Sequence, residues 1–140
     1  MEFRLTTAVS PSKVQQLLYG PTLRPYICSE LLGKVLVEKA GTPVSLVVTD
    51  CDAALDLRAQ VQQPVVWLAA LDHTLFHEWE ATLIAKAKSY ALLAHPKYPQ
   101  DVETVKALLA KTELGDLAEP FGRVREALVE ARKMGALKAA

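Results

Sequence analysis

The sequence lacks several features that mark specialised classes of protein. No apolar run approaches the length of about 18 residues that a membrane-spanning helix requires, and the first residues carry no apolar signal-peptide core. The 16 basic and 16 acidic side chains cancel, so no chain-wide positive field attracts phosphate backbones. We therefore expect a cytoplasmic protein with no membrane partner, and the composition leaves nucleic-acid binding unsupported.

Particular residue types and motifs are also scarce. The chain has no asparagine and only two isoleucines, a bias that fits a thermophilic or GC-rich source, phages included. Its two cysteines, Cys28 and Cys51, lack the repeated CxxC or Cys/His spacing of a zinc site, and both look like small buried apolar side chains. The glycine-rich loops of dinucleotide- and NTP-binding proteins and the GxSxG motif of hydrolases are missing. No motif therefore assigns an activity.

What the chain does have is an ordinary globular composition. Hydrophobic residues make up 51% and charged residues 23% of its 140 residues. A chain of this size buries roughly two-thirds of its unfolded surface, which is enough for a core of its own. We expect one domain over residues 1–140.

Two short apolar runs predict a parallel βαβ unit. Residues 43–49 and 64–70 have the composition of buried strands, and the segment between them has helical periodicity. Strand, helix and strand within about thirty residues should give two parallel strands. Alternating apolar and polar residues over 2–8 predict a third strand in the same sheet. The expected fold class is α/β, a small sheet covered by helices, and the alternative is a mostly α fold in which either apolar run is helical.

Capping residues predict two helices in the first third of the chain. A short helix over 11–19 has Ser10 as its N-cap and Gly20 just past its end. A second helix, over 25–40, has its apolar residues on one face and is followed by Gly41.

The last half of the chain is predicted to be helical. Periodic apolar residues indicate a long helix over 73–95 and further helices over 101–114, with Asp101 as cap, and over 119–134. The Pro-rich stretch near 95–100 is the predicted hinge before this C-terminal helical pair.

The carboxyl ends of the two predicted parallel strands are the best place to look for chemistry. Asp50 and Asp52 follow the first strand, and Asp72 and His73 follow the second, with His77 one helical turn later. Ligands of open parallel sheets bind at the carboxyl ends of strands. We therefore expect these side chains to share one edge of the sheet.

On the predicted helix over 73–95, two histidines and a glutamate fall close to one line. Such a set could hold zinc or another divalent metal with an open coordination position, and one carboxylate or histidine could then act as general base for a metal-bound water. The candidate metal ligands are His73, His77, Glu80 and Asp72, and the candidate catalytic residues are Asp50, Asp52, Asp72 and His77.

A purely structural explanation competes with the metal site. Asp50 and Asp72 are natural N-caps, and Glu78 and Glu80 lie in first turns, where the helix dipole favours negative charge. His73 and His77 lie away from the predicted apolar side of this helix, an arrangement that is typical of a solvated face. This explanation is the one we favour, with no cofactor.

Because these polar residues are already accounted for, the sequence favours a non-catalytic protein-binding module. Such a module would be a regulator or accessory subunit that docks on a larger protein assembly. Most polar candidates already have a capping or solvated role, whereas an enzyme needs several convergent polar groups. The alternatives are a small metal-dependent hydrolase or nuclease and a nucleic-acid-binding regulator that uses the basic C-terminal helix. The partner-binding candidates on that helix are Arg123, Arg125, Arg132 and Lys133.

Overall fold

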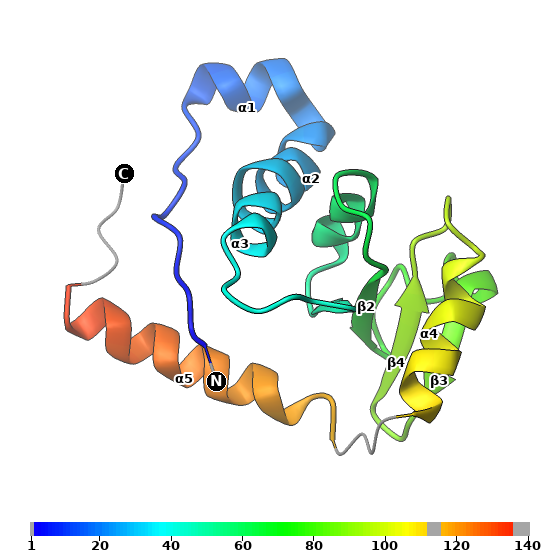
Figure 1. The fold of residues 1–140 in the computed structure, drawn as a ribbon. Helices are drawn as coiled ribbons and strands as arrows, with labels where there is room; N and C mark the ends of the chain where they lie inside the picture. The colour runs from blue at the N-terminus through cyan, green and yellow to red at the C-terminus, as the bar shows by residue number, and fades with distance from the viewer. Residues whose placement is uncertain (1, 112–115, 136–140) are drawn as a thin grey trace.

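A mixed sheet of four strands, in the order β1-β2-β4-β3, organises the molecule (Figure 1). The computed structural model describes residues 2–111 and 116–135. β1 (Val47–Thr49) runs parallel to β2 (Val65–Ala70), while β4 (Tyr90–Ala94) lies antiparallel between β2 and β3 (Leu83–Lys86). The sheet and the helix α4 gather at one end of the molecule, the helices α1, α2 and α3 lie at the other, and α5 runs along one side.

The predicted βαβ unit is confirmed by the parallel pairing of β1 and β2. Val47 pairs with Val65 and Thr49 with Trp67, and both strands fall inside the predicted apolar runs. The connection is a 3-10 helix, η3 (Asp52–Ala59), rather than an α-helix. The fold class is α/β, as expected.

The predicted long helix over 73–95 is wrong. Turns occupy residues 71–79, a short 3-10 helix η4 (Glu80–Thr82) follows, and β3 and β4 then form an antiparallel pair. Backbone groups along a buried strand need partners on both sides, and β1 covers only one side of β2. β4 pairs along the other side, from Val66 with Ala94 to Ala70 with Tyr90. Tertiary pairing therefore overrides the helical propensity of this Ala- and Leu-rich segment.

Residues 2–8, all described, do not add a strand to the sheet, which corrects the second expectation. They run as an arm between the helical stretch that follows α1 and the C-terminal helix (Figure 1). Residues 3–9 line a cavity of about 510 Å³ together with Leu32, Leu36, Val124 and Leu128. Leu5 and Thr6 are half-buried while Phe3 is 50% exposed, so the alternation of apolar and polar residues does not mark one buried face of the arm.

The two N-terminal helical predictions are largely confirmed. α1 (Lys13–Tyr19) is capped by Ser12 rather than Ser10, and Gly20 follows it with φ +52°. After η1 (Gly20–Thr22), the second predicted helix appears as one continuous stretch. It consists of α2 (Leu23–Tyr26), the π-helical η2 (Ile27–Gly33) and α3 (Lys34–Glu38).

Both C-terminal helices form within their predicted ranges. They are α4 (Asp101–Ala110) and α5 (Glu119–Lys133), and the predicted end of the first, at 112–114, lies outside the described residues. Asp101 is not the cap, because Gln100 holds that position and Asp101 is buried. The predicted hinge at 95–100 is a run of hydrogen-bonded turns, and whether it bends stays a prediction.

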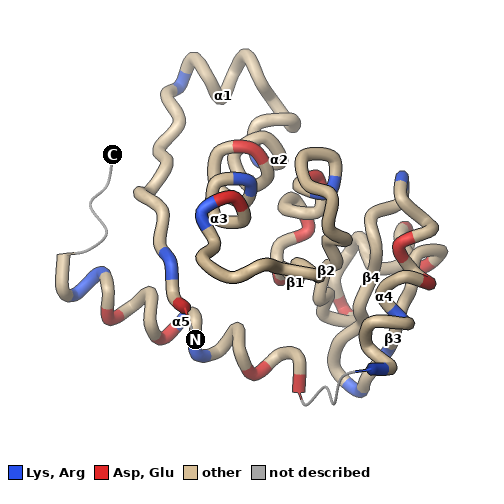
Figure 2. Tube along the Cα trace, viewed as in Figure 1, with Lys and Arg blue, Asp and Glu red and all other residues tan. Residues whose placement is uncertain are grey.

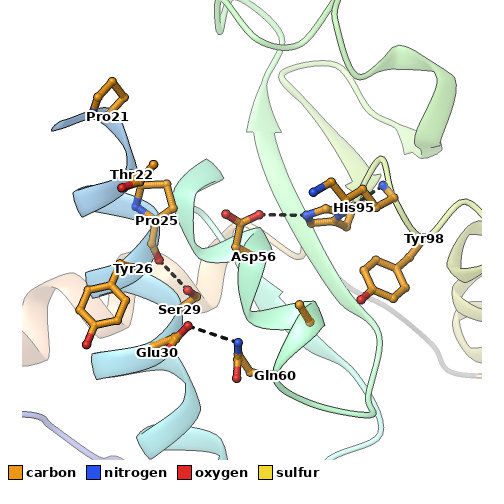
Figure 3. Close-up of a pocket in the computed structure, with 12 residues that line it drawn as sticks. Pro21, Thr22, Pro25, Tyr26, Ser29, Glu30, Asp56, Gln60, His95 and Tyr98 are labelled. Carbon is orange, nitrogen blue, oxygen red and sulfur yellow. Dashed lines mark hydrogen bonds and ion pairs between the residues drawn. The ribbon is translucent and has the colours of Figure 1, made fainter. Parts of the chain in front are cut away.

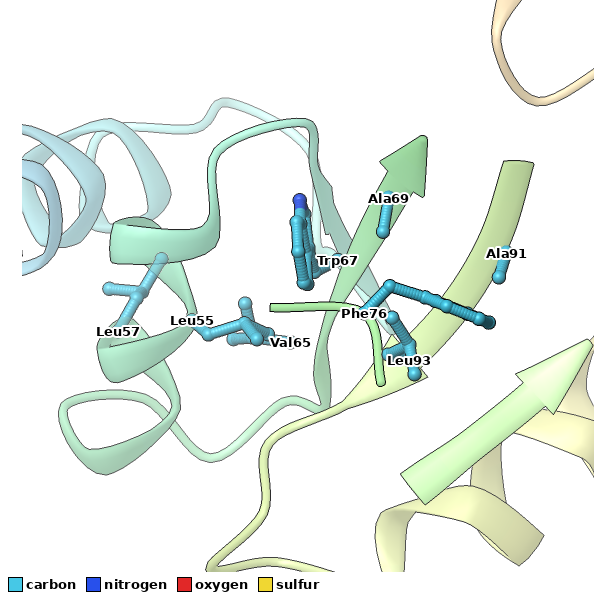
Figure 4. Packing of buried hydrophobic residues seen from close by; sticks show 8 residues of the cluster. All are labelled: Leu55, Leu57, Val65, Trp67, Ala69, Phe76, Ala91 and Leu93. Carbon is cyan, nitrogen blue, oxygen red and sulfur yellow. The ribbon is translucent and has the colours of Figure 1, made fainter. Parts of the chain in front are cut away.

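The alternating side chains of β2 separate two hydrophobic clusters. Val65, Trp67 and Ala69 face the cluster that contains residues of η3 and Phe76 (Figure 4). Val66 and Leu68 face the other cluster, to which α4 contributes Val105. The sheet is thus a middle layer with η3 and the 71–79 turns on one face and α4 on the other. Within the described ranges, no helix is long and apolar enough to cross a membrane.

Candidate functional site

The carboxyl edge of the parallel strands does contain a cavity, of about 290 Å³. Asp50 follows β1 and His73 follows β2, and both line this cavity together with Trp67, Tyr90 and Arg125. The expected meeting of these two residues at one edge is confirmed. Arg125 belongs to α5. The sequence around Asp50 gives no indication that this residue lines the same cavity.

The two polar residues of this cavity that the sequence singled out, Asp50 and His73, already have partners. Asp50 forms an ion pair with Arg125. The backbone N–H of Leu75 donates to Nδ1 of His73 at 3.2 Å, so the proton of the neutral ring is on Nε2. The His73 ring also lies edge-on to Trp67, with 4.7 Å between centroids. These contacts hold the 71–75 turn and α5 against the sheet.

The other candidate residues of the sequence are not brought into this cavity. Asp52 forms an ion pair with Arg24 at 2.9 Å, and this hydrogen bond raises the pKa of Arg24. Asp72, His77 and Glu80 are exposed. The helix that was to align the histidines with Glu80 does not form. Across residues 2–111 and 116–135, no three His, Cys, Asp or Glu side chains are placed to hold a metal ion.

The basic side chains of α5 do not form a separate patch. Figure 2 shows basic and acidic residues interleaved along this helix. Arg123 pairs with Glu119 at 2.7 Å and Lys133 pairs with Glu130 at 2.7 Å. Arg132 lines the cavity beside the N-terminal arm, and Arg125 is held by Asp50.

A larger cavity, of about 560 Å³, lies between α2, η2, η3 and the turn after β4 (Figure 3). His95, which is 7% exposed, is its most buried ionisable side chain. Its Nε2 lies 2.9 Å from Oδ1 of Asp56, and its Nδ1 accepts the backbone N–H of Lys97 at 3.0 Å. The proton is therefore on Nε2 and is donated to Asp56. With both ring nitrogens engaged, His95 can act as a base only by breaking one of these contacts.

The opposite wall of this cavity also has internal partners. Ser29 donates to the carbonyl of Pro25 at 2.6 Å, and Gln60 donates to Glu30 at 3.3 Å. The first contact joins η2 to α2, and the second ties the end of η3 to η2.

A buried ion pair fixes the stretch beside this cavity. Arg58 of η3 donates to both carboxylate oxygens of Asp101, at 2.6 and 3.3 Å, and its guanidinium lies 4.3 Å from the Tyr98 ring centroid. The hydrogen bond to Asp101 raises the pKa of Arg58. The sequence suggested a capping role for Asp101 and gave no signal for Arg58, because the two residues are 43 positions apart.

The most exposed apolar surface with helical order is on α1. Its residues Val14, Leu17 and Leu18, here called the α1 apolar face, are 63%, 72% and 79% exposed. All seven residues of α1 are described, and none is buried. The sequence predicted the helix but placed its apolar residues in no particular role.

Comparison with protein-family models, with curated proteins and with solved structures gives no match for this chain. Function is therefore inferred from the arrangement of its residues.

Proposed function

We propose that this protein is a non-catalytic binding module whose α1 apolar face docks into an apolar groove of a partner protein in a larger assembly. The observation that carries the proposal is the exposure of Val14, Leu17 and Leu18, at 63%, 72% and 79%. Single exposed apolar residues are common, but three on one face of a helix mark an interaction surface. At spacing i, i+3 and i+4, they match the anchors of a helix that binds in a groove.

The helix that carries this face is formed before any partner arrives. Ser12 Oγ accepts the backbone N–H of Gln15 at 3.2 Å, and Gln15 Oε1 accepts the backbone N–H of Ser12 at 2.8 Å. This reciprocal capping box and Gly20 define both ends of a helix that buries none of its own residues. A preformed helix lowers the ordering cost of binding.

The partner must offer an apolar groove without charges at its centre. Between residues 11 and 22 the only charged side chain is Lys13, at the start of the helix, and the rest of α1 carries no charge (Figure 2). Two copies of so short a face, laid against each other, would bury far less than the roughly 800 Å² per partner of a standard interface. A groove that surrounds the helix on three sides covers more of each side chain, which favours a different protein over a second copy.

The polar cavities support a non-catalytic role. Asp50 is paired with Arg125, and both ring nitrogens of His95 are engaged. A catalytic site needs convergent groups that remain available to a substrate.

The test compares Leu17→Ser/Leu18→Ser with Val129→Ser, a control for an exposed apolar residue on α5 that is itself 50% exposed. Each tagged protein is recovered from its source cells and the stoichiometry of co-purifying protein is measured. We expect a one-to-one partner with wild type and Val129→Ser and none with the double variant, at unchanged circular dichroism. A partner that the double variant retains would refute docking through α1. A wild-type dimer that the double variant converts to monomer would identify a second copy as the occupant.

A further inference from the structure

The two cysteines of the chain lie side by side. Cys28 belongs to η2 and Cys51 directly precedes η3, 23 positions later, yet their sulfurs are 3.9 Å apart. Both are half-buried rather than fully buried, which corrects the expectation of two small buried apolar side chains. A disulfide has an S–S bond of about 2.0 Å, so a shift of about 2 Å separates this pair from bonding.

The packing of the two elements holds the sulfurs in place independently of their own contact. Gly33 of η2 sits so close to its neighbours that an added Cβ would lie 2.8 Å from the carbonyl oxygen of Cys28 and 3.0 Å from Leu57 of η3. Arg24 of α2, which is continuous with η2, donates to Asp52 of η3 at 2.9 Å and to Cys51 Sγ at 3.4 Å. The juxtaposition of the thiols is therefore a property of the fold.

Both cysteines are partly accessible from a surface cavity. Cys28 and Cys51 line a surface cavity of about 300 Å³ whose other walls are mainly apolar, among them Leu36, Val48 and Ala54. A small disulfide such as oxidised glutathione can approach there, as the exchange reaction requires.

We infer that Cys28 and Cys51 form a reversible intramolecular disulfide by exchange with a low-molecular-weight disulfide, with Cys51 reacting first, and that the bond clamps η2 to the junction of β1 and η3. The inference does not depend on docking through α1. It assigns a redox modification site to a region that the proposed function leaves without a role.

The exchange proceeds in two balanced steps. The Cys51 thiolate attacks one sulfur of the small disulfide RSSR, which forms Cys51–S–SR and releases RS⁻. The Cys28 thiolate then attacks Cys51 Sγ, which forms the protein disulfide and releases a second RS⁻. Two protein thiols are oxidised and one RSSR is reduced to two RSH, which carry the two thiol protons.

The surroundings of the two sulfurs set this order. The guanidinium of Arg24 donates to Cys51 Sγ at 3.4 Å, so the sulfur that we expect to react first has a cation beside it. Burial, followed by the negative charge of Cys51, raises the pKa of Cys28 to about 11. The second cause disappears once Cys51 is part of a mixed disulfide, so Cys28 becomes easier to ionise when it has a disulfide to attack.

The experiment incubates the reduced full-length protein with oxidised glutathione and follows intact mass, free thiols and the unfolding midpoint. We expect both thiols to disappear, the mass to fall by two hydrogens, and the midpoint to rise by roughly 5 to 15 °C, all reversed by dithiothreitol. Stable glutathione adducts on the wild type, a covalent dimer, or a disulfide that leaves the midpoint unchanged would each overturn the inference.

Single variants test the order of the two steps. Cys28→Ser should stop as a glutathione adduct on Cys51, because the sulfur that resolves it is missing. Cys51→Ser should form its adduct about tenfold more slowly, because burial still raises the pKa of Cys28 in this variant. Equal adduct rates in the two variants would refute Cys51 as the first sulfur to react. Cys28→Ser/Cys51→Ser, the matched control, should show no midpoint change with glutathione.

Discussion

The stretch from β1 to α4 and the helices around it are built in different ways. Among the described residues, every buried hydrophobic side chain lies between positions 53 and 105, whereas α1, α3 and α5 contain no buried residue. The sheet region holds the fold together, and the outer helices carry apolar side chains on their surfaces. Substitutions on the α1 apolar face should therefore affect binding far more than folding.

The largest expected contrast comes from one substitution made in both regions. Leu92 of β4 is 1% exposed and Leu18 of α1 is 79% exposed. Leu92→Ala should lower the free energy of unfolding by about 2 to 5 kcal/mol, because it removes buried atoms and leaves a cavity, whereas Leu18→Ala should change it by less than about 0.5 kcal/mol. Urea denaturation measures both. Similar losses would mean that Leu18 packs into the core.

A slightly smaller effect is expected at the buried ion pair. Arg58→Met leaves the Asp101 carboxylate, 5% exposed, without its cation and should lower the free energy of unfolding by about 3 kcal/mol. Lys106→Met, which removes an exposed partner of Glu103 at 3.2 Å, is the control and should cost less than about 0.5 kcal/mol. If the two variants unfold at the same urea concentration, the pair at Asp101 does not hold the β4–α4 turn.

Two glycines sharpen the comparison, because the same substitution by alanine should change the free energy of unfolding in opposite directions. Gly33→Ala pushes a methyl group against the Cys28 carbonyl at 2.8 Å, and we expect a loss of about 1 to 3 kcal/mol in the free energy of unfolding. At Gly122, inside α5, an added Cβ would have no heavy atom of the described residues within 4 Å apart from its chain neighbours and the nearby backbone of its own helix. Gly122→Ala should gain about 0.5 to 1 kcal/mol, because alanine loses less backbone entropy in a helix. Thermal or urea unfolding distinguishes the signs, and a stabilising Gly33→Ala would mean that η2 and η3 are loosely packed.

The parallel strands were predictable because their sequences are continuous apolar runs, the pattern of strands buried on both faces. The hairpin of β3 and β4 was not, because its Ala- and Leu-rich segment also fits a helix. The segment forms a strand because it pairs with the free edge of β2, where Leu68 pairs with Leu92 and Trp67 with Leu93. Local propensity cannot predict a pairing with a distant strand.

In the candidate site, too, part of the arrangement was predictable from the sequence and part depends on residues far apart in the chain. Asp50 and His73 were placed together correctly because a general rule of parallel sheets locates them. The partners that engage the polar groups come from distant parts of the chain. Arg125 is 75 positions from Asp50, and Asp56 is 39 positions from His95. No pattern in the sequence links residues so far apart.

The smallest expected effect is that of added metal. Zinc, manganese or magnesium at a hundred times its dissociation constant would stabilise a protein with a site by about 2.7 kcal/mol, or roughly 5 to 15 °C in the unfolding midpoint. We expect metal-stripped protein to shift by less than about 1 °C, because His73 is held by Leu75 and Trp67 while His77 is exposed in a turn. His73→Ala/His77→Ala is the control. A rise in the wild type that this variant loses would require the 71–79 turns to rearrange around the ion. In that case the carboxyl edge, with Asp50 and Asp72 beside it, would be a metal centre and the binding-module proposal would give way to a metal-dependent hydrolase.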